Sequence, residues 1–159
     1  MREIKFRGKV IDRPMCYKLG DWAIGDLFHF YDEGWIIQTP HDGTLEWSGI
    51  VDENTIGQFT GWKDMHGKEI YDGDILAVKF NNRYCERISW QGEPNAIGTV
   101  FWDFNSFRLK CAGKEDRRYA DFYDFLDNRE QVYNVLDMSL QNTEIIGNIH
   151  ENEDLLKCE

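Results

Sequence analysis

The residues of this chain best suited to chemistry are two carboxylates that flank a glycine. Asp72 and Asp74 form an Asp-x-Asp pair around Gly73, and such a pair can hold Mg²⁺ through its oxygen atoms, as a metal-dependent hydrolase requires. A tight turn selects the same residue types, because aspartate accepts nearby backbone N–H groups and glycine tolerates unusual backbone angles. We interpret Asp72, Gly73 and Asp74 as a structural turn and predict no metal site.

The other reactive side chains lack the spacing of a catalytic site. The four histidines are scattered, and the four cysteines include no C-x-x-C pair, so we expect reduced thiols. The sequence has no Gly-x-Ser-x-Gly, no Gly-x-Gly-x-x-Gly and no Walker-type lysine loop. We therefore predict no catalytic residue, no cofactor and no enzymatic activity.

Aromatic residues are the first candidates for a binding surface. The chain has six tryptophans, seven tyrosines and ten phenylalanines among 159 residues, and tryptophan and tyrosine are enriched in protein interfaces. Filling a small core is the simpler use of such residues. Trp90, which lies beside a variable segment containing Gly92 and Pro94, is the leading candidate for an exposed role, followed by Trp35.

A row of basic residues is the second candidate. Lys5, Arg7 and Lys9 alternate with apolar residues near the N-terminus, a period of two that indicates a half-buried strand. The simple interpretation is a solvated face. The alternative is a rim that pairs with an acidic partner or with the acidic C-terminal part of the chain.

The elements that position these residues are predicted to be strands. Apolar and β-branched runs alternate with turn residues along most of the chain, and only Arg117–Asp127 has the three- and four-residue spacing of a short helix. After the basic N-terminal strand, we predict strands at 22–31, 35–39, 44–47, 56–62, 75–80, 98–103, 106–111, 131–136 and 144–150.

Two turns lie close together in the centre of the chain. Asp64 and Gly67 supply the first, and Asp72, Gly73 and Asp74 supply the second, with a short strand between them. The Ile-x-x-Gly-Asp-x-Leu pattern that ends this segment places apolar residues toward a small core on either side of a flexible glycine. This pattern favours an SH3-like small barrel.

These elements predict a mainly β fold with two subdomains, which can also count as one domain. A polar turn near Asn54 separates an N-terminal β-hairpin subdomain, residues 1–54, from an SH3-like subdomain, residues 55–152. Strand edges of an open N-terminal sheet would permit self-association. The polar residues 153–159 are expected to form a frayed tail.

Three segments of the chain resemble the YopX family of phage and prophage proteins. The central run Ile56–Ile75 resembles the family signature, Met1–Lys9 resembles its first strand, and Glu144–Asn152 resembles its closing strand. The resemblance implies a phage or prophage origin and an all-β fold with an SH3-like part. It implies no catalytic residues, because the family has no established activity to transfer.

The functional hypotheses follow from this resemblance and from charge. We expect a non-enzymatic phage accessory protein, of unknown biochemical role, that self-associates or binds an unidentified phage or host protein. Between Glu115 and Glu159, twelve acidic residues oppose four basic ones, within a net charge of −11. The negative electrostatic field of so many carboxylates repels phosphates and therefore disfavours nucleic-acid binding. Two alternatives remain: charge mimicry directed at host nucleic-acid-binding proteins, and direct nucleic-acid binding through the SH3-like part and the basic row.

Location is predicted from what the sequence lacks. No apolar run reaches the ~18 residues of a membrane span, and the N-terminus lacks the apolar core of a signal peptide. We therefore expect a cytoplasmic protein of the bacterial host cell that does not contact the membrane.

Overall fold

The computed structural model describes residues 3–12, 17–30, 34–41, 44–78, 96–103, 106–112, 132–134 and 143–157. Strands dominate these residues and all of their pairings are antiparallel, so the prediction of a mainly β fold is confirmed. Trp90 and the predicted helix at 117–127 lie outside the described residues. No described helix has both the length and the apolar character needed to cross a bilayer.

The chain divides into two compact units. The first contains Met1–Trp62 and Glu69–Asp72, and the second contains Lys63–Lys68 and Gly73–Glu159. The predicted boundary near Asn54 falls inside the first unit, because strand β5 and the short strand β6 belong with the N-terminal strands.

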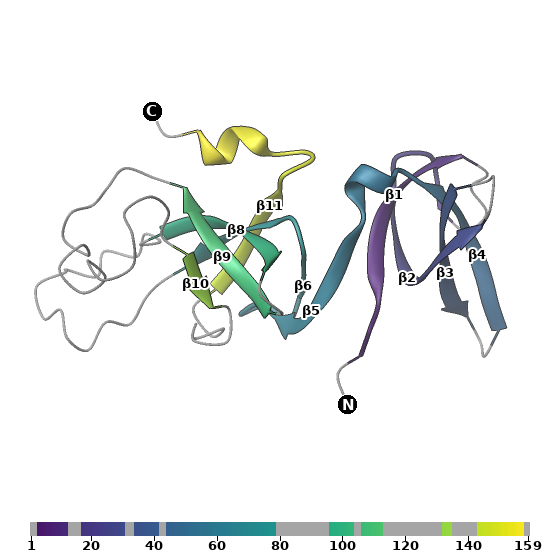
Figure 1. Cartoon of the computed structure of the whole chain (residues 1–159), viewed down its shortest axis with the longest axis horizontal. Coiled ribbons are helices and arrows are strands. Elements are labelled where there is room, and N and C mark those ends of the chain that lie inside the picture. Colours follow the sequence, from purple (N-terminus) through teal and green to yellow (C-terminus); the bar gives the residue numbers. More distant parts are fainter. Residues whose placement is uncertain are drawn as a thin grey trace, which may run out of the picture. The chain divides into compact units, whose positions relative to one another are not determined.

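The first unit holds a six-stranded sheet with the order β2-β3-β4-β1-β5-β6, in which β2 also pairs with β1 (Figure 1). Its elements are β1 (Phe6–Asp12), β2 (Trp22–Phe30), β3 (Gly34–His41), β4 (Thr44–Val51), a 3-10 helix η1 (Glu53–Thr55), β5 (Gly57–Lys63, whose last residue belongs to the second unit) and β6 (Glu69–Tyr71).

Strand β1 closes four of these strands into a ring. Its first half pairs with β2 on one edge and with β5 on the other, and its second half pairs with β4. Since β2 pairs with β3 and β3 with β4, the hydrogen bonding returns to its start. The prediction of an open N-terminal sheet is therefore wrong, because β1 covers edges that successive hairpins alone would leave exposed.

The interior of the ring holds a small apolar core. Val10, Ala23, Ile37 and Val51 are buried there, one from each of β1 to β4, with Tyr17, Leu27, Trp35 and Ile56 packed against them. Along the first half of β2 the buried Ala23 and Gly25 alternate with the exposed Ile24 and Asp26, as the period of a strand requires. In β1, Arg7 and Gly8 are both buried, so both sides of this strand are covered there.

The second unit holds a five-stranded antiparallel sheet with the order β10-β9-β8-β7-β11 (Figure 1). Its elements are β7 (Asp74–Val78), β8 (Ala96–Asp103), β9 (Ser106–Ala112), β10 (Val132–Asn134), β11 (Thr143–Asn148) and a 3-10 helix η4 (Glu153–Leu156). Helix η4 lies in the segment that we predicted to be a frayed tail, so Glu153–Leu156 are more ordered than their polar composition indicated.

Candidate functional site

The three basic residues at the start of the chain lie against aromatic rings of the first unit. The guanidinium carbon of Arg7 is 4.8 Å from the ring centre of Trp22 and 5.1 Å from that of Tyr71. The ammonium of Lys9 is 5.7 Å from the centre of the Trp22 ring, and the ammonium of Lys5 is 4.8 Å from the centre of the Phe59 ring. Each such contact contributes roughly 0.5–2 kcal/mol. We call Lys5, Arg7 and Lys9 the cationic row.

The cationic row is not the solvated face that the sequence predicted. Arg7 is only 9% exposed, and its Nη2 donates a hydrogen bond to the backbone carbonyl of Asp72 at 3.3 Å. Strand alternation correctly placed the row outside the apolar core, but β6 and the ring of Trp22 then cover that face. The cations therefore contribute to packing, and a basic rim for a partner has little support from Arg7.

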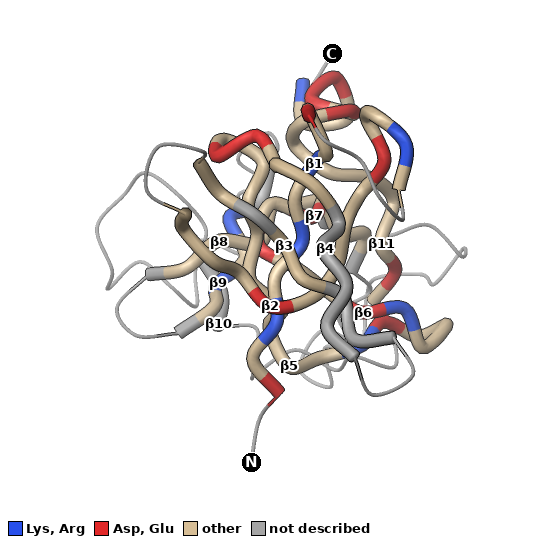
Figure 2. The backbone as a smooth tube through the Cα atoms, turned by 90° about the vertical axis from the view of Figure 1, so that its right-hand side faces the viewer, with Lys and Arg blue, Asp and Glu red and all other residues tan. Residues whose placement is uncertain are grey.

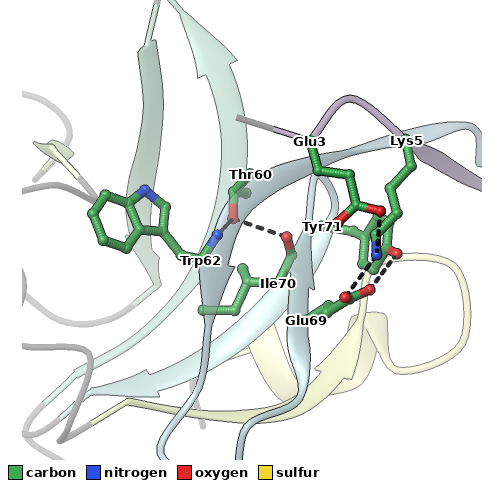
Figure 3. Close-up of polar contacts among 7 residues, drawn as sticks. All are labelled: Glu3, Lys5, Thr60, Trp62, Glu69, Ile70 and Tyr71. Atoms are coloured by element: carbon green, nitrogen blue, oxygen red, sulfur yellow. Dashed lines mark hydrogen bonds and ion pairs between the residues drawn. The ribbon is translucent and has the colours of Figure 1, made fainter. Parts of the chain in front are cut away.

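Glu69 joins the first member of this row to β6 (Figure 3). The ammonium of Lys5 donates to Glu69 Oε1 at 2.6 Å, and the Tyr71 hydroxyl donates to Glu69 Oε2 at 2.9 Å. Glu3 lies 3.4 Å from the same ammonium. Each oxygen of the Glu69 carboxylate thus accepts a hydrogen bond, and the bond from Lys5 links the N-terminal segment to β6.

The titration of these groups follows from their surroundings. Burial disfavours the charge on Lys5, but the hydrogen bond and charge of Glu69, with Glu3, outweigh it and raise the pKa of Lys5. Burial, together with the bond to Glu69, raises the pKa of the Tyr71 hydroxyl far above its ordinary range. At neutral pH Lys5 is therefore charged and Tyr71 is protonated. The group holds its protons firmly, which suits a structural contact and not an acid or base.

Removing this ammonium should destabilise the first unit. We expect Lys5→Met to lower the free energy of unfolding by about 1–2 kcal/mol at neutral pH, because Glu69 loses a charged partner in a partly buried place. Since the folded pKa is raised, this contribution is present below the ordinary lysine pKa. It disappears as the pH rises through the folded value, so the unfolding curves of the two proteins should start to converge only above the ordinary lysine pKa of about 10.4.

Lys157→Met is a matched control for urea unfolding. Lys157 faces Glu153 at 3.9 Å with both side chains well exposed, so its loss should cost less than about 0.5 kcal/mol. Equal effects of the two substitutions would show that the contact between Lys5 and Glu69 adds nothing beyond an exposed ion pair.

Asp64 organises the turn after β5. Its Oδ1 accepts the backbone N–H groups of His66 and Lys68, both at 2.9 Å, and its Oδ2 accepts that of Ile145 on β11 at 3.2 Å. Gly67 completes the turn with φ +81°, in the left-handed region that glycine adopts readily. Although burial of the side chain opposes its charge, the three N–H groups lower the pKa of Asp64. The charged carboxylate therefore stabilises the turn and links it to β11.

Asp72 and Asp74 occupy different units. The Asp72 backbone N–H donates to Gln58 at 2.9 Å, while Asp74 begins β7 with 1% of its surface exposed. Between them, Gly73 has φ +82° and donates its N–H to the Val100 carbonyl at 2.9 Å. Within the part of the chain that the structure describes, no three histidine, cysteine or acidic side chains group as metal ligands.

The outward side of β2 carries an apolar stripe. Ile24, Phe28 and Phe30 are 37%, 44% and 46% exposed, respectively, and Asp26 is the exposed acidic residue between them. These even-numbered residues share one face of the strand, which spans roughly 20 Å from the first to the last. We call Ile24, Asp26, Phe28 and Phe30 the β2 outer face.

The sequence contained a signal for the β2 outer face that our interpretation missed. A half-buried strand has polar residues on its outward side, whereas Trp22 to Phe30 is apolar on both sides. We counted these residues only as strand formers. Of the two predicted tryptophans, Trp35 is half-buried against the apolar core inside the closed ring of strands, and the centre of its indole lies 4.8 Å from that of the His29 imidazole. Trp90 lies outside the described residues.

The second unit also shows an aromatic residue at its surface. Trp102, near the end of β8, is 47% exposed and meets the buried Phe107 of β9 edge-on, with ring centres 4.7 Å apart. This contact ties the exposed ring to the sheet core. Trp102 is a single exposed apolar side chain, so among the described strands the β2 outer face is the longer exposed apolar stripe.

Comparisons with known proteins give one family and one structural likeness of note. The family model described as YopX protein matches residues 5–157. No curated protein matches the chain. Among solved structures, the crystal structure of protein EF1440 from Enterococcus faecalis is 21% identical, with a TM-score of 0.47, over 99% of this chain and 100% of that one.

Proposed function

Because the chain belongs to the YopX family, we propose that it is a phage-type accessory protein that acts by binding another protein. Its partner would be a phage or host protein in the bacterial cytoplasm, or a second copy of the chain. The observation on which this proposal rests is the β2 outer face, where the large apolar side chains of Ile24, Phe28 and Phe30 are exposed on one side of the strand. Exposed apolar stripes of this kind mark interaction surfaces, since leaving them in water is unfavourable.

Several reactive side chains are engaged within the fold, which supports binding over catalysis. Lys5, Glu69 and Tyr71 satisfy one another, and Asp64 accepts three backbone N–H groups. A catalytic acid or base needs a pKa near neutrality, whereas the pKa of Lys5 is raised and that of Asp64 is lowered. These shifts move both groups away from the range in which they could exchange protons.

Charge mimicry is the second candidate. Glu144 on β11 is exposed, and so are Glu151, Glu153 and Asp154 toward the C-terminal end. Asp and Glu are drawn red in Figure 2, which shows red segments next to the C-terminus. Such carboxylates can occupy positions that phosphates take on a basic protein. Direct nucleic-acid binding has less support, because the cationic row lies over aromatic rings. A capture experiment that yields only nucleic-acid-binding proteins, released by moderate salt, would favour mimicry.

Replacing two phenylalanines tests the proposed function. The double variant Phe28→Ser/Phe30→Ser should fold with a free energy of unfolding within about 1 kcal/mol of the original, since both rings are already half-exposed. It should lose at least tenfold of its affinity for the partner, because the apolar anchors of the interface are gone. The measurement is quantitative affinity capture from phage-infected cells, with light scattering to follow self-association.

Leu155→Ser is a matched control, because Leu155 is a similarly exposed apolar residue in the second unit. It should leave both measurements unchanged. If every protein captured by the original chain is still captured by the double variant, and its molar mass in solution is the same, the β2 outer face is not the binding surface.

A further inference from the structure

Asp26 is the unusual member of the β2 outer face. It is exposed between Ile24 and Phe28, and within the described residues its carboxylate forms no hydrogen bond or ion pair. An interface that covers the three apolar side chains would also remove this carboxylate from water. Burial of a lone charge costs several kcal/mol unless an opposite charge or hydrogen-bond donors meet it.

From this placement we propose that the partner presents an apolar surface that contains a lysine or arginine positioned against Asp26. This inference rests on the proposed function and specifies the chemistry of the partner. A cation at that position would turn the cost of burying Asp26 into an interfacial ion pair, which favours the correct partner over others. The net charge of −11 would add a longer-range attraction for a basic protein.

A second copy of the chain fits this surface poorly. The midpoint of the stripe lies between Asp26 and Phe28. A two-fold axis through this midpoint would bring the Asp26 carboxylates of both copies into one interface. Two like charges in a region that excludes water repel strongly, and two chains of net charge −11 also repel at long range. Charge complementarity therefore selects a different, basic protein over self-association.

Synthetic peptides test this chemistry without knowledge of the natural partner. The probes are a short peptide in which leucine and lysine alternate and its counterpart in which leucine and glutamate alternate, with binding measured by calorimetry. The original chain should bind the lysine peptide and not the glutamate peptide. Asp26→Asn should weaken binding of the lysine peptide by about fivefold, whereas Asp154→Asn, which removes an exposed carboxylate of the second unit, should weaken it by less than about twofold.

The possible outcomes separate the inference from the proposed function. If Asp26→Asn and Asp154→Asn have equal effects while Phe28→Ser/Phe30→Ser still abolishes binding, the face binds proteins but Asp26 does not select them, and the inference is overturned. Absence of any binding to the lysine peptide, or concentration-dependent dimers that Phe28→Ser/Phe30→Ser removes, would overturn it as well. If the double variant has no effect on the peptides or on capture from cells, the proposed function itself fails.

Discussion

Replacing Gly57 with alanine should lower the free energy of unfolding by about 3 kcal/mol, a large effect for one added methyl group. Gly57 is buried at the start of β5, opposite Arg7 in the strand pairing. A Cβ at this position would overlap the backbone carbonyl oxygen of Asp72 and lie 3.7 Å from Nε of Arg7. A backbone atom cannot rotate away as a side chain can, so the strands must separate.

The same substitution would disturb the cationic row. The Asp72 carbonyl that the new methyl group displaces is the acceptor for Arg7 Nη2, and the Asp72 N–H donates to Gln58 next along β5. Urea unfolding followed by tryptophan fluorescence measures both stability and the surroundings of Trp22, whose ring stacks on Arg7. We expect the native emission to shift as well as the midpoint.

Gly20→Ala separates steric overlap from backbone preference. Gly20 has φ +86° with nothing within 4 Å of its absent Cβ, so alanine there should cost only about 1 kcal/mol of backbone strain. If Gly57→Ala lowers the free energy of unfolding no more than Gly20→Ala does, then β5 can move away from the Asp72 carbonyl at little cost. The close approach of Asp72 would then not constrain the residue at position 57.

The second large effect is expected at Asp64. Asp64→Ala should destabilise the second unit by about 3 kcal/mol, because the N–H groups of His66, Lys68 and Ile145 all lose a charged acceptor near a buried position. Asp64→Asn keeps one oxygen acceptor and should lose less. The comparison is made by urea unfolding at neutral pH.

The pH dependence of this effect has a definite sign. The folded pKa of Asp64 is lowered, so its contribution is fully present above the ordinary aspartate value and falls as the pH drops through the folded value. The stability advantage of the original chain over Asp64→Asn should therefore shrink below about pH 4. A difference that is constant down to about pH 2 would show that the carboxylate charge does not contribute.

Local signals in the sequence predicted the strands well. The hairpin between β8 and β9 was expected at 98–103 and 106–111, and the structure has Ala96–Asp103 and Ser106–Ala112. The short strand between the two central turns was also expected, and it is β6. These elements follow from alternation and from turn residues such as Gly67 and Gly73, which act over a few positions only.

Long-range contacts could not be read in the same way. Closure of the ring depends on Val10 pairing with Val51, and the cover over Arg7 depends on Trp22 and on Tyr71, far along the chain. Alternation indicates which side of a strand a residue faces, but it does not indicate what lies on that side. For that reason alternation alone placed the cationic row in solvent, whereas the apolar residues on both sides of Trp22–Phe30 did indicate the β2 outer face.

The closed ring has a consequence for synthesis on the ribosome. Of the described strands, β1 is translated before the others, yet its partners in β4 and β5 reach as far as Gln58. A nascent chain must keep this strand unpaired on those edges until some fifty further residues have emerged, as the pairing of Phe6 with Gln58 requires. Shielding of the nascent β1 by chaperones, or a delay in reaching the native state, is expected of a strand whose partners β4 and β5 are translated so much later.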